Sequence, residues 1–103
     1  MKISTMINKF FQNEFETTDR KTIENTWGER VKPVAGTNKV EISTTYFYEM
    51  QESTARVAGR FIEFAATQGV TVTFPVQNVC FARKPWPKQS WATVTVEVVE
   101  GVN

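Results

Sequence analysis

The sequence predicts an α+β fold in which helices pack on one face of an antiparallel sheet. Apolar residues recur three and four positions apart in 5–16 and 52–68, which is typical of helices. They recur at every second position in 30–34, 39–50, 70–76 and 90–100, which is typical of strands. The expected order is α-(α)-β-β-α-β-β-β, with four to five strands, one long helix and one or two shorter helices. A chain of 103 residues fits one domain, spanning residues 1–103.

The N-terminal segment predicts one helix and leaves a second element open. The helix is expected over 5–16, with Ser4 or Thr5 as its cap. Its apolar stripe consists of Ile3, Ile7, Phe10, Phe11 and Phe15. Residues 17–28 fit either a short helix, capped by Thr18 or Asp19, or a strand. The pattern favours the helix, with Gly28 ending it.

The next two strands form a hairpin around residues 35–38. Pro33 cannot donate a hydrogen bond to a neighbouring strand, so 30–34 is expected at a sheet edge. In 39–50 the positions of Val40, Ile42 and Met50 share the face expected to meet the core. Glu41, Ser43, Thr45, Phe47 and Glu49 share the other face.

The long helix is expected over 52–68, ended by Gly69. Its expected buried stripe is Ala55, Ala58, Phe61, Ile62 and Ala65, broadened by Val57. Gly59 lowers the helix propensity of this segment, so we interpret it as a position where the helix backbone packs closely on the sheet.

Two or three strands follow the long helix. Val70, Val72, Phe74 and Val76 share one register, whereas Val79 and Phe81 share the opposite one. A bulge or tight turn at 75–78 would explain that slip. In the last strand, 90–100, every second residue from Ala92 to Val98 is expected to face the core.

Composition excludes several kinds of enzyme. The chain has no histidine and one cysteine, Cys80, so it holds no Ser-His-Asp or Cys-His pair, no Cys/His zinc site and no intramolecular disulfide. Tyr46 and Tyr48 are interpreted as packing residues, and Cys80 as a buried, inert thiol. We expect a protein that is not an enzyme and carries no cofactor or metal.

The charge balance and the hydropathy pattern restrict partners and compartment. Twelve Lys and Arg against eleven Asp and Glu give a net charge of +1, which argues against phosphate clamping as the main task. No signal-peptide segment and no apolar stretch of about 20 residues occurs. We therefore expect a cytoplasmic protein with no membrane partner.

The basic and aromatic segment 83–91 is the strongest candidate for a binding site. Arg83, Lys84 and Lys88 lie in a stretch, 64–96, that contains no acidic residue, and Trp86 and Trp91 flank them. Pro85 and Pro87 stiffen the segment, which reduces the entropy lost on binding, and Trp and Arg are enriched in binding hot spots. The alternative is that Trp86 folds back and caps the core.

A second candidate is the outer face of the sheet, which the pattern makes rich in hydroxyl side chains. Threonine is favoured on pleated, half-exposed surface, so a purely structural interpretation is the stronger one. As a docking face it would use Phe47 and Trp91 as apolar anchors. The members expected on it are Ser43, Thr45, Phe47, Thr71, Thr73, Trp91, Thr93 and Thr95.

These observations favour a small protein-binding domain that regulates or inhibits a larger protein or complex. Chains of this size without catalytic groups include phage and mobile-element products directed at host defence. The expected partner-binding residues are Arg83, Lys84, Trp86, Lys88 and Trp91, with Phe47 secondary. The alternative is a nucleic-acid-binding module that uses the same segment, since bases stack on aromatic rings and cations meet phosphates. A homo-oligomer is a third possibility.

Overall fold

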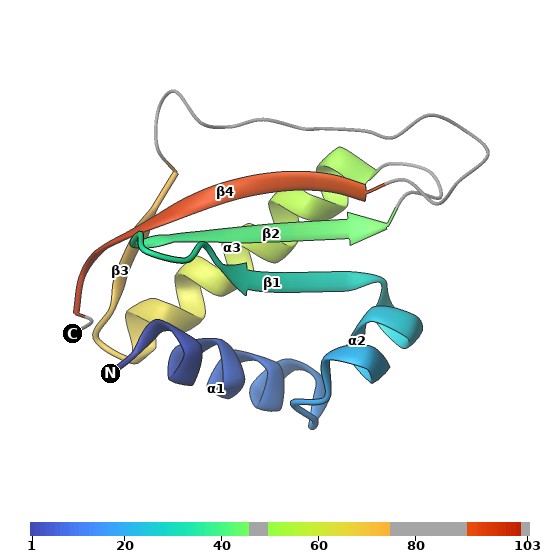
Figure 1. Ribbon diagram of the computed structural model, residues 1–103, viewed down its shortest axis with the longest axis horizontal. Helices are drawn as coiled ribbons and strands as arrows, with labels where there is room; N and C mark the ends of the chain where they lie inside the picture. The colour runs from blue at the N-terminus through green and yellow to red at the C-terminus, as the bar shows by residue number, and fades with distance from the viewer. Residues whose placement is uncertain (46–49, 75–90, 102–103) are drawn as a thin grey trace.

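The computed structural model describes residues 1–45, 50–74 and 91–101, with the backbone alone for 45, 50–53, 91 and 92. Its four strands form one antiparallel sheet, with α3 behind the sheet and α1 and α2 along the side of β1 (Figure 1). The predicted α+β class is therefore confirmed. The elements are α1 (Ile3–Phe15), α2 (Arg20–Trp27), β1 (Glu29–Pro33), β2 (Lys39–Thr45), α3 (Met50–Thr67), β3 (Thr71–Thr73) and β4 (Trp91–Glu100).

The sheet has the strand order β1-β2-β4-β3. Because β2 and β3 are each antiparallel to β4, they run parallel to each other on either side of it. The connection from β2 to β3 through α3, with β4 inserted between them, is a split β–α–β arrangement. β4, the last strand of the sequence, thus lies between strands that precede it.

β1 lies at one edge of this sheet, as Pro33 predicts. The Val34 amide donates to the carbonyl of Lys39 at 2.9 Å, which marks a hydrogen-bonded pair of the β1–β2 hairpin. Hydrogen-bonded and non-bonded pairs alternate along an antiparallel ladder. The Pro33–Val40 pair is therefore non-bonded, and the ring nitrogen of Pro33 faces the outer edge, where no ladder bond is lost.

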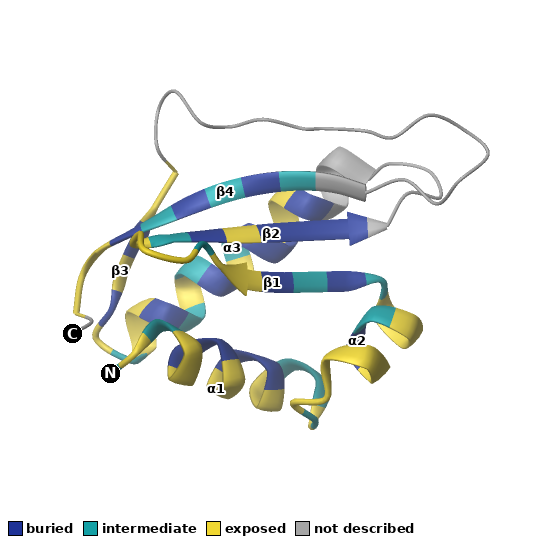
Figure 2. Ribbon diagram, in the orientation of Figure 1, coloured by how far each residue is buried: buried dark blue, intermediate teal, exposed yellow. Residues whose placement is uncertain are grey.

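The core lies between the sheet and the helices (Figure 2). Phe10 of α1 packs against α3. Its ring centroid is 5.2 Å from that of Phe61, which it meets edge-on, and 5.8 Å from that of Phe64. The predicted inward residues of β4, from Val94 to Val98, are buried. The sheet contributes Val31, Val40, Ile42, Val72, Val94, Val96 and Val98, and the helices Met6, Ile7, Phe10, Phe11, Ile23, Val57, Ala58, Phe61 and Ala65.

The two N-terminal helices correct one expectation and confirm another. α1 begins at Ile3, so the N-cap position falls on Lys2 and not on Ser4 or Thr5. Ile3, the first residue of the expected apolar stripe, is half-buried against the core and lies inside the helix. The second short helix is present, and Gly28 ends it in the left-handed conformation at φ 66°.

α3 differs from its prediction in its start and at one position of its buried stripe, whereas Val57, Ala58, Phe61 and Ala65 are buried as expected. Met50, expected at the end of a strand, begins α3, and the strand before it ends at Thr45. Thr54 is fully buried and Ala55 is exposed, so the expected stripe was wrong at Ala55. A threonine lies in the core because its hydroxyl is hydrogen-bonded there to Thr44, at 2.6 Å.

Two further expectations about α3 and β3 fail. A Cβ atom built on Gly59 meets nothing within 4 Å, so this glycine does not mark a close approach of helix and sheet. Phe74 is 39% exposed and follows the end of β3 at Thr73, so it does not continue the buried face. Val76, Val79, Phe81 and the expected bulge at 75–78 lie outside the described residues.

Glycines determine how the end of β4 meets the turn after α3. Gly69 has φ +75°, as expected for a helix-ending glycine. A Cβ atom on Gly101, whose φ is +97°, would lie 2.3 Å from the carbonyl oxygen of Gly69 and 2.8 Å from the Cα of Val70. The chain can approach this turn so closely only because residue 101 has no side chain.

Within residues 1–45, 50–74 and 91–101, no helix has the length and apolar character needed to cross a membrane.

Candidate functional site

Most of the sequence-predicted binding residues lie in parts of the chain that are not described. Phe47 falls within 46–49, and Arg83, Lys84, Trp86 and Lys88 fall within 75–90. Tyr46, Tyr48 and Cys80, which were interpreted as structural, also lie outside the described residues. Trp91 is placed by its backbone as the first residue of β4.

The backbone of Trp91 locates one end of the predicted binding segment on the sheet. Trp91 is paired with Thr45, the last residue of β2. The chain therefore enters the sheet after residue 90 and leaves it before residue 46 at neighbouring points. Thr45 and Trp91, the described residues that border the stretches 46–49 and 83–90 in sequence, are therefore neighbours at one end of the sheet.

The face of the sheet opposite the described helices carries polar side chains in rows; we call it the open face. Its first row is Arg30, Ser43 and Thr93, and its second is Lys32, Glu41 and Thr95. Its third row is Lys39, Glu97 and Thr73. The structure therefore brings together Ser43, Thr73, Thr93 and Thr95, which the sequence placed on a hydroxyl-rich face.

A hydroxyl pair lies in the middle of the open face. Ser43 and Thr93 are directly opposite each other on β2 and β4, and their hydroxyl oxygens are 2.9 Å apart. The Asn38–Val98 backbone bond of 2.8 Å sets the ladder alternation and makes Ser43–Thr93 a non-bonded backbone pair. Side chains of such pairs are close together, which permits the hydroxyl contact.

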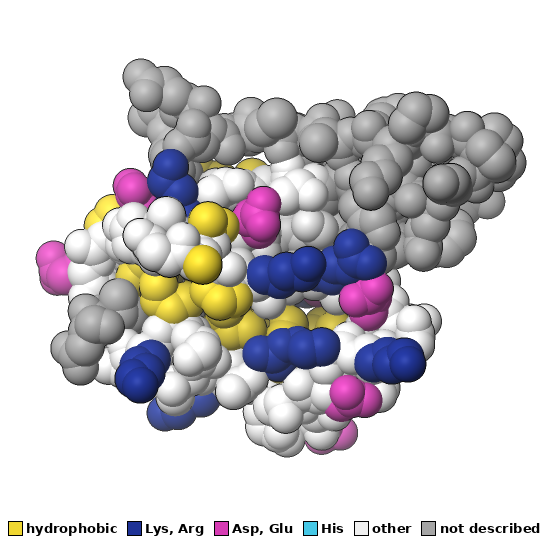
Figure 3. Space-filling view, viewed as in Figure 1, with side chains coloured by type: hydrophobic (Ala, Val, Ile, Leu, Met, Phe, Trp, Pro, Cys, Tyr) yellow, Lys and Arg dark blue, Asp and Glu magenta, His cyan; other side chains and the backbone are white. Residues whose placement is uncertain are grey.

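Charge on the open face is arranged in columns. Arg30 and Lys32 lie on β1, whereas Glu41 and Glu97 lie nearer the middle, on β2 and β4. Arg30 is also held from α2, since its Nη2 atom is 2.6 Å from Oε1 of Glu24, and this hydrogen bond lowers the pKa of Glu24. Figure 3 shows cationic side chains gathered along this side of the molecule, with acidic side chains between and beside them.

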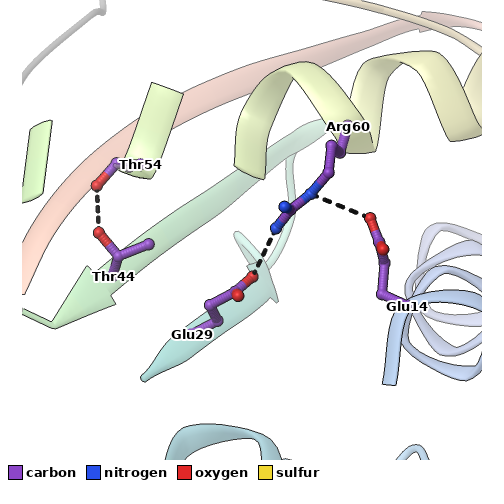
Figure 4. Close-up of polar contacts among 5 residues, drawn as sticks. All are labelled: Glu14, Glu29, Thr44, Thr54 and Arg60. Carbon is purple, nitrogen blue, oxygen red and sulfur yellow. Dashed lines mark hydrogen bonds and ion pairs between the residues drawn. The ribbon is translucent and has the colours of Figure 1, made fainter. Parts of the chain in front are cut away.

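A different cluster of charges lies on the opposite, helix-covered side of the sheet. Glu29 points inward at the start of β1, and its side chain is 10% exposed. Arg60 of α3 reaches toward it and toward Glu14 of α1 (Figure 4). The Arg60 Nε atom is 3.1 Å from Glu14 Oε1, whereas its Nη2 atom is 3.6 Å from Glu29 Oε1.

The Glu29 carboxyl is poorly compensated for its burial. Its Oε1 atom is buried and has no hydrogen-bond partner. Burial raises the pKa of Glu29 to about 7, the nearby Arg60 guanidinium opposes that rise and the Glu14 carboxylate adds to it. The charge of this carboxyl therefore changes near neutral pH.

The sequence analysis missed the Glu14–Arg60–Glu29 cluster, although one signal for Glu29 was present. In a strand, residues two apart share a face, so Glu29 shares the inward face with Val31. Nothing in the sequence indicates that α1 and α3 bring Glu14 and Arg60 to the same place. The same holds for the buried Thr44–Thr54 hydroxyl contact between β2 and α3.

Among the described residues, no group of three or more His, Cys, Asp or Glu side chains is arranged to hold a metal ion. The chemistry visible in the described part consists of hydroxyl hydrogen bonding, paired charges and one carboxyl that titrates near neutrality.

Comparison with known proteins gave no match to a protein-family model, to a curated protein or to a solved structure.

Proposed function

We propose that this protein is a non-enzymatic binding domain that regulates or inhibits a larger protein or complex. The observation that carries the proposal is the pairing of Trp91 with Thr45, because it joins the basic and aromatic segment to one end of the open face. We place the protein in the cytoplasm. We include host-defence machinery, the target of many small phage and mobile-element products, among its possible partners.

The open face supports a contact function by its rigidity. Its polar side chains stand on paired strands, and the Ser43–Thr93 contact holds two of them in one arrangement. Short side chains that are already ordered lose little entropy when a partner covers them. Ser43 is itself buried, so the hydroxyl groups that a partner would meet are those of the half-buried Thr93 and Thr95.

The sequence of 83–91 adds large aromatic side chains, whereas the described side chains of the open face carry hydroxyl groups or charges. Trp86 and Trp91 provide apolar area, and Arg83, Lys84 and Lys88 provide cations in a stretch without acids. Aromatic residues and arginine carry much of the binding energy in protein interfaces, whereas polar surroundings adjust orientation. We therefore assign the anchors to 83–91, with Phe47 secondary, and a supporting role to the open face.

The test is a binding measurement with a partner captured from the native host and then purified. The Arg83→Ala, Trp86→Ala double variant should weaken binding at least tenfold. The control, Lys9→Ala with Trp27→Ala, removes a cation and a tryptophan from α1 and α2 and should leave affinity unchanged. Equal affinities for the two double variants would refute the assignment of the anchors.

The open face is tested by a single bulky charge. Thr95→Arg places a long cation in its second row, and we expect it to weaken partner binding. The control makes the same change at Thr5, an exposed residue of α1. Binding that is insensitive to Thr95→Arg would limit the contact to the 83–91 segment.

Nucleic-acid binding is the second candidate, and the cations of β1 favour it. Arg30 and Lys32 place two cations on the open face, in addition to those that the sequence of 83–91 contains. Binding to phosphates weakens steeply as salt rises, whereas an aromatic protein interface is less sensitive. Fluorescence titration with single- and double-stranded oligonucleotides at two salt concentrations separates the candidates, and absence of binding at low salt removes this one.

A homo-oligomer remains a third arrangement to test. Pro33 removes a donor from the outer edge of β1, so we do not propose pairing through that edge. Light scattering at high protein concentration would detect association through another surface.

A further inference from the structure

The Glu14–Arg60–Glu29 cluster connects three elements that are distant in sequence. Glu14 lies in the last turn of α1, Arg60 in the middle of α3 and Glu29 at the start of β1. One guanidinium group thus serves two carboxyl groups, as Figure 4 shows. The guanidinium group is closer to Glu14 than to Glu29. The nitrogen–oxygen distance of 3.1 Å to Glu14 is a hydrogen-bonding length, whereas the distance of 3.6 Å to Glu29 is not.

The two carboxyl groups differ in their access to water. The Glu14 side chain is 23% exposed and the Arg60 side chain is 47% exposed, whereas the Glu29 side chain is 10% exposed. Water can replace either partner of the Glu14 contact, so losing that contact changes an equilibrium by several-fold at most. Water cannot do so for Glu29 Oε1, which is buried and has no hydrogen-bond partner. The stability of the cluster therefore depends on whether Glu29 carries a charge.

We propose that Glu14, Arg60 and Glu29 form a proton-sensitive clasp that controls how firmly α1 is held against α3 and β1. With Glu29 protonated, its neutral carboxyl is tolerated in the interior and Arg60 stays with Glu14, which holds the end of α1. With Glu29 ionised, the buried charge attracts Arg60 away from Glu14, and α1 loses that contact. The inference concerns regulation of the fold and does not depend on the proposed binding function.

The other groups around Glu29 do not supply an alternative charge. Thr44 of β2 is opposite Glu29 and is uncharged. On α2, the Glu24 carboxylate is bonded to Arg30, whose side chain belongs to the other face of β1. Among the described residues, the charges that act on Glu29 are therefore those of Arg60 and Glu14. The pKa of Glu29, raised to about 7, places the change of state close to neutral pH.

The first experiment is an NMR titration of the side-chain carboxyl carbons in the whole protein. The pKa of Glu29 should be near 7 rather than at the ordinary glutamate value of 4.5. Arg60→Gln should raise the Glu29 midpoint and Glu14→Gln should lower it, each by about half a unit or more. Glu63→Gln, an exposed change on the same helix as Arg60, is the control and should not move it. An ordinary midpoint, or one unaffected by both cluster variants, overturns the proposal.

The second experiment measures the consequence for α1. Hydrogen exchange of the α1 amides, corrected for the intrinsic effect of pH, should show several-fold weaker protection at pH 8 than at pH 6. Glu29→Gln should remove that difference, because it keeps the neutral shape at both pH values. If α1 protection in the wild-type protein does not change between the two pH values, Glu29 is a buried acid without a clasp.

Discussion

The two faces of the sheet are built from the same strands and serve different ends. On the helix-facing side, the buried side chains pack against the helices through apolar contacts. They include Val40, Ile42, Val94 and Val96. On the open face, the residues between them carry hydroxyl groups or charges. Alternation along a strand thus gives one face to the core and leaves the other polar. The comparison predicts large effects of substitutions on stability on one side and small ones on the other.

The largest effect is expected for Phe10→Ala. The Phe10 ring is fully buried and lies against Phe11, Phe61 and Phe64. Its loss removes apolar burial and leaves a cavity, so the free energy of unfolding should fall by about 3–5 kcal/mol. Urea denaturation measures the fall. A loss below about 1 kcal/mol would show that the helix layer does not depend on this ring.

Gly101→Ala should destabilise the protein by more than its matched control, Gly36→Ala. Both glycines have positive φ, but a Cβ atom at residue 36 meets nothing within 4 Å, whereas one at residue 101 lies 2.3 Å from a backbone oxygen. The control should cost about 1 kcal/mol through strain alone, and Gly101→Ala about 2 kcal/mol or more because the backbone must also shift. Thermal melting compares them, and equal losses would refute the close contact.

The third effect is a pH dependence of stability that comes from Glu29, the charged residue on the buried face of the sheet. Because folding raises the pKa of Glu29 from 4.5 to about 7, the folded state binds more protons than the unfolded state between these values. Stability should therefore fall as pH rises through that window, and level off above it, with a total cost of about 1–3 kcal/mol. Glu29→Gln should flatten the curve measured by urea denaturation at several pH values, while Glu63→Gln should keep the wild-type slope.

The smallest effect is expected on the open face. Ser43→Ala and Thr93→Ala each remove one hydroxyl of a part-buried pair, so each should cost about 0.2–1 kcal/mol. The double variant should cost less than the sum of the two single variants, because the second change finds its partner already absent. Additive losses would show that the hydroxyl contact has no energetic role.

Sequence reasoning located the elements well where local pattern determines structure. The period of the apolar residues identified α1, α3 and β4, and the glycine at 28 ended α2 as expected. It failed where a residue on another element determines which side chain is buried. Thr54 occupies a core position that the pattern gave to Ala55, because Thr44 on another element provides its hydrogen bond. Apolarity alone cannot reveal such a partner.

The candidate site divides in the same way. The hydroxyl residues of the open face followed from strand alternation, and the structure places Ser43 opposite Thr93. The Glu14–Arg60–Glu29 cluster depends on how α1 and α3 cross the sheet, and sequence distance hides that arrangement. Gly101 was also missed, since its need for glycine arises from contact with Gly69, on another element.

The position of β4 between β2 and β3 has a consequence for how the chain reaches its native state. As the polypeptide emerges from the ribosome, α1, α2 and the β1–β2 hairpin can form from local contacts. β3 has to wait, because its pairing in the described sheet is with β4, which is synthesised later. Closing the sheet is therefore a late, long-range step, and such steps are slow and leave strand edges exposed. Interrupting synthesis before residue 91 would yield a chain with the β1–β2 hairpin but without the strand that pairs with β3 in the described sheet.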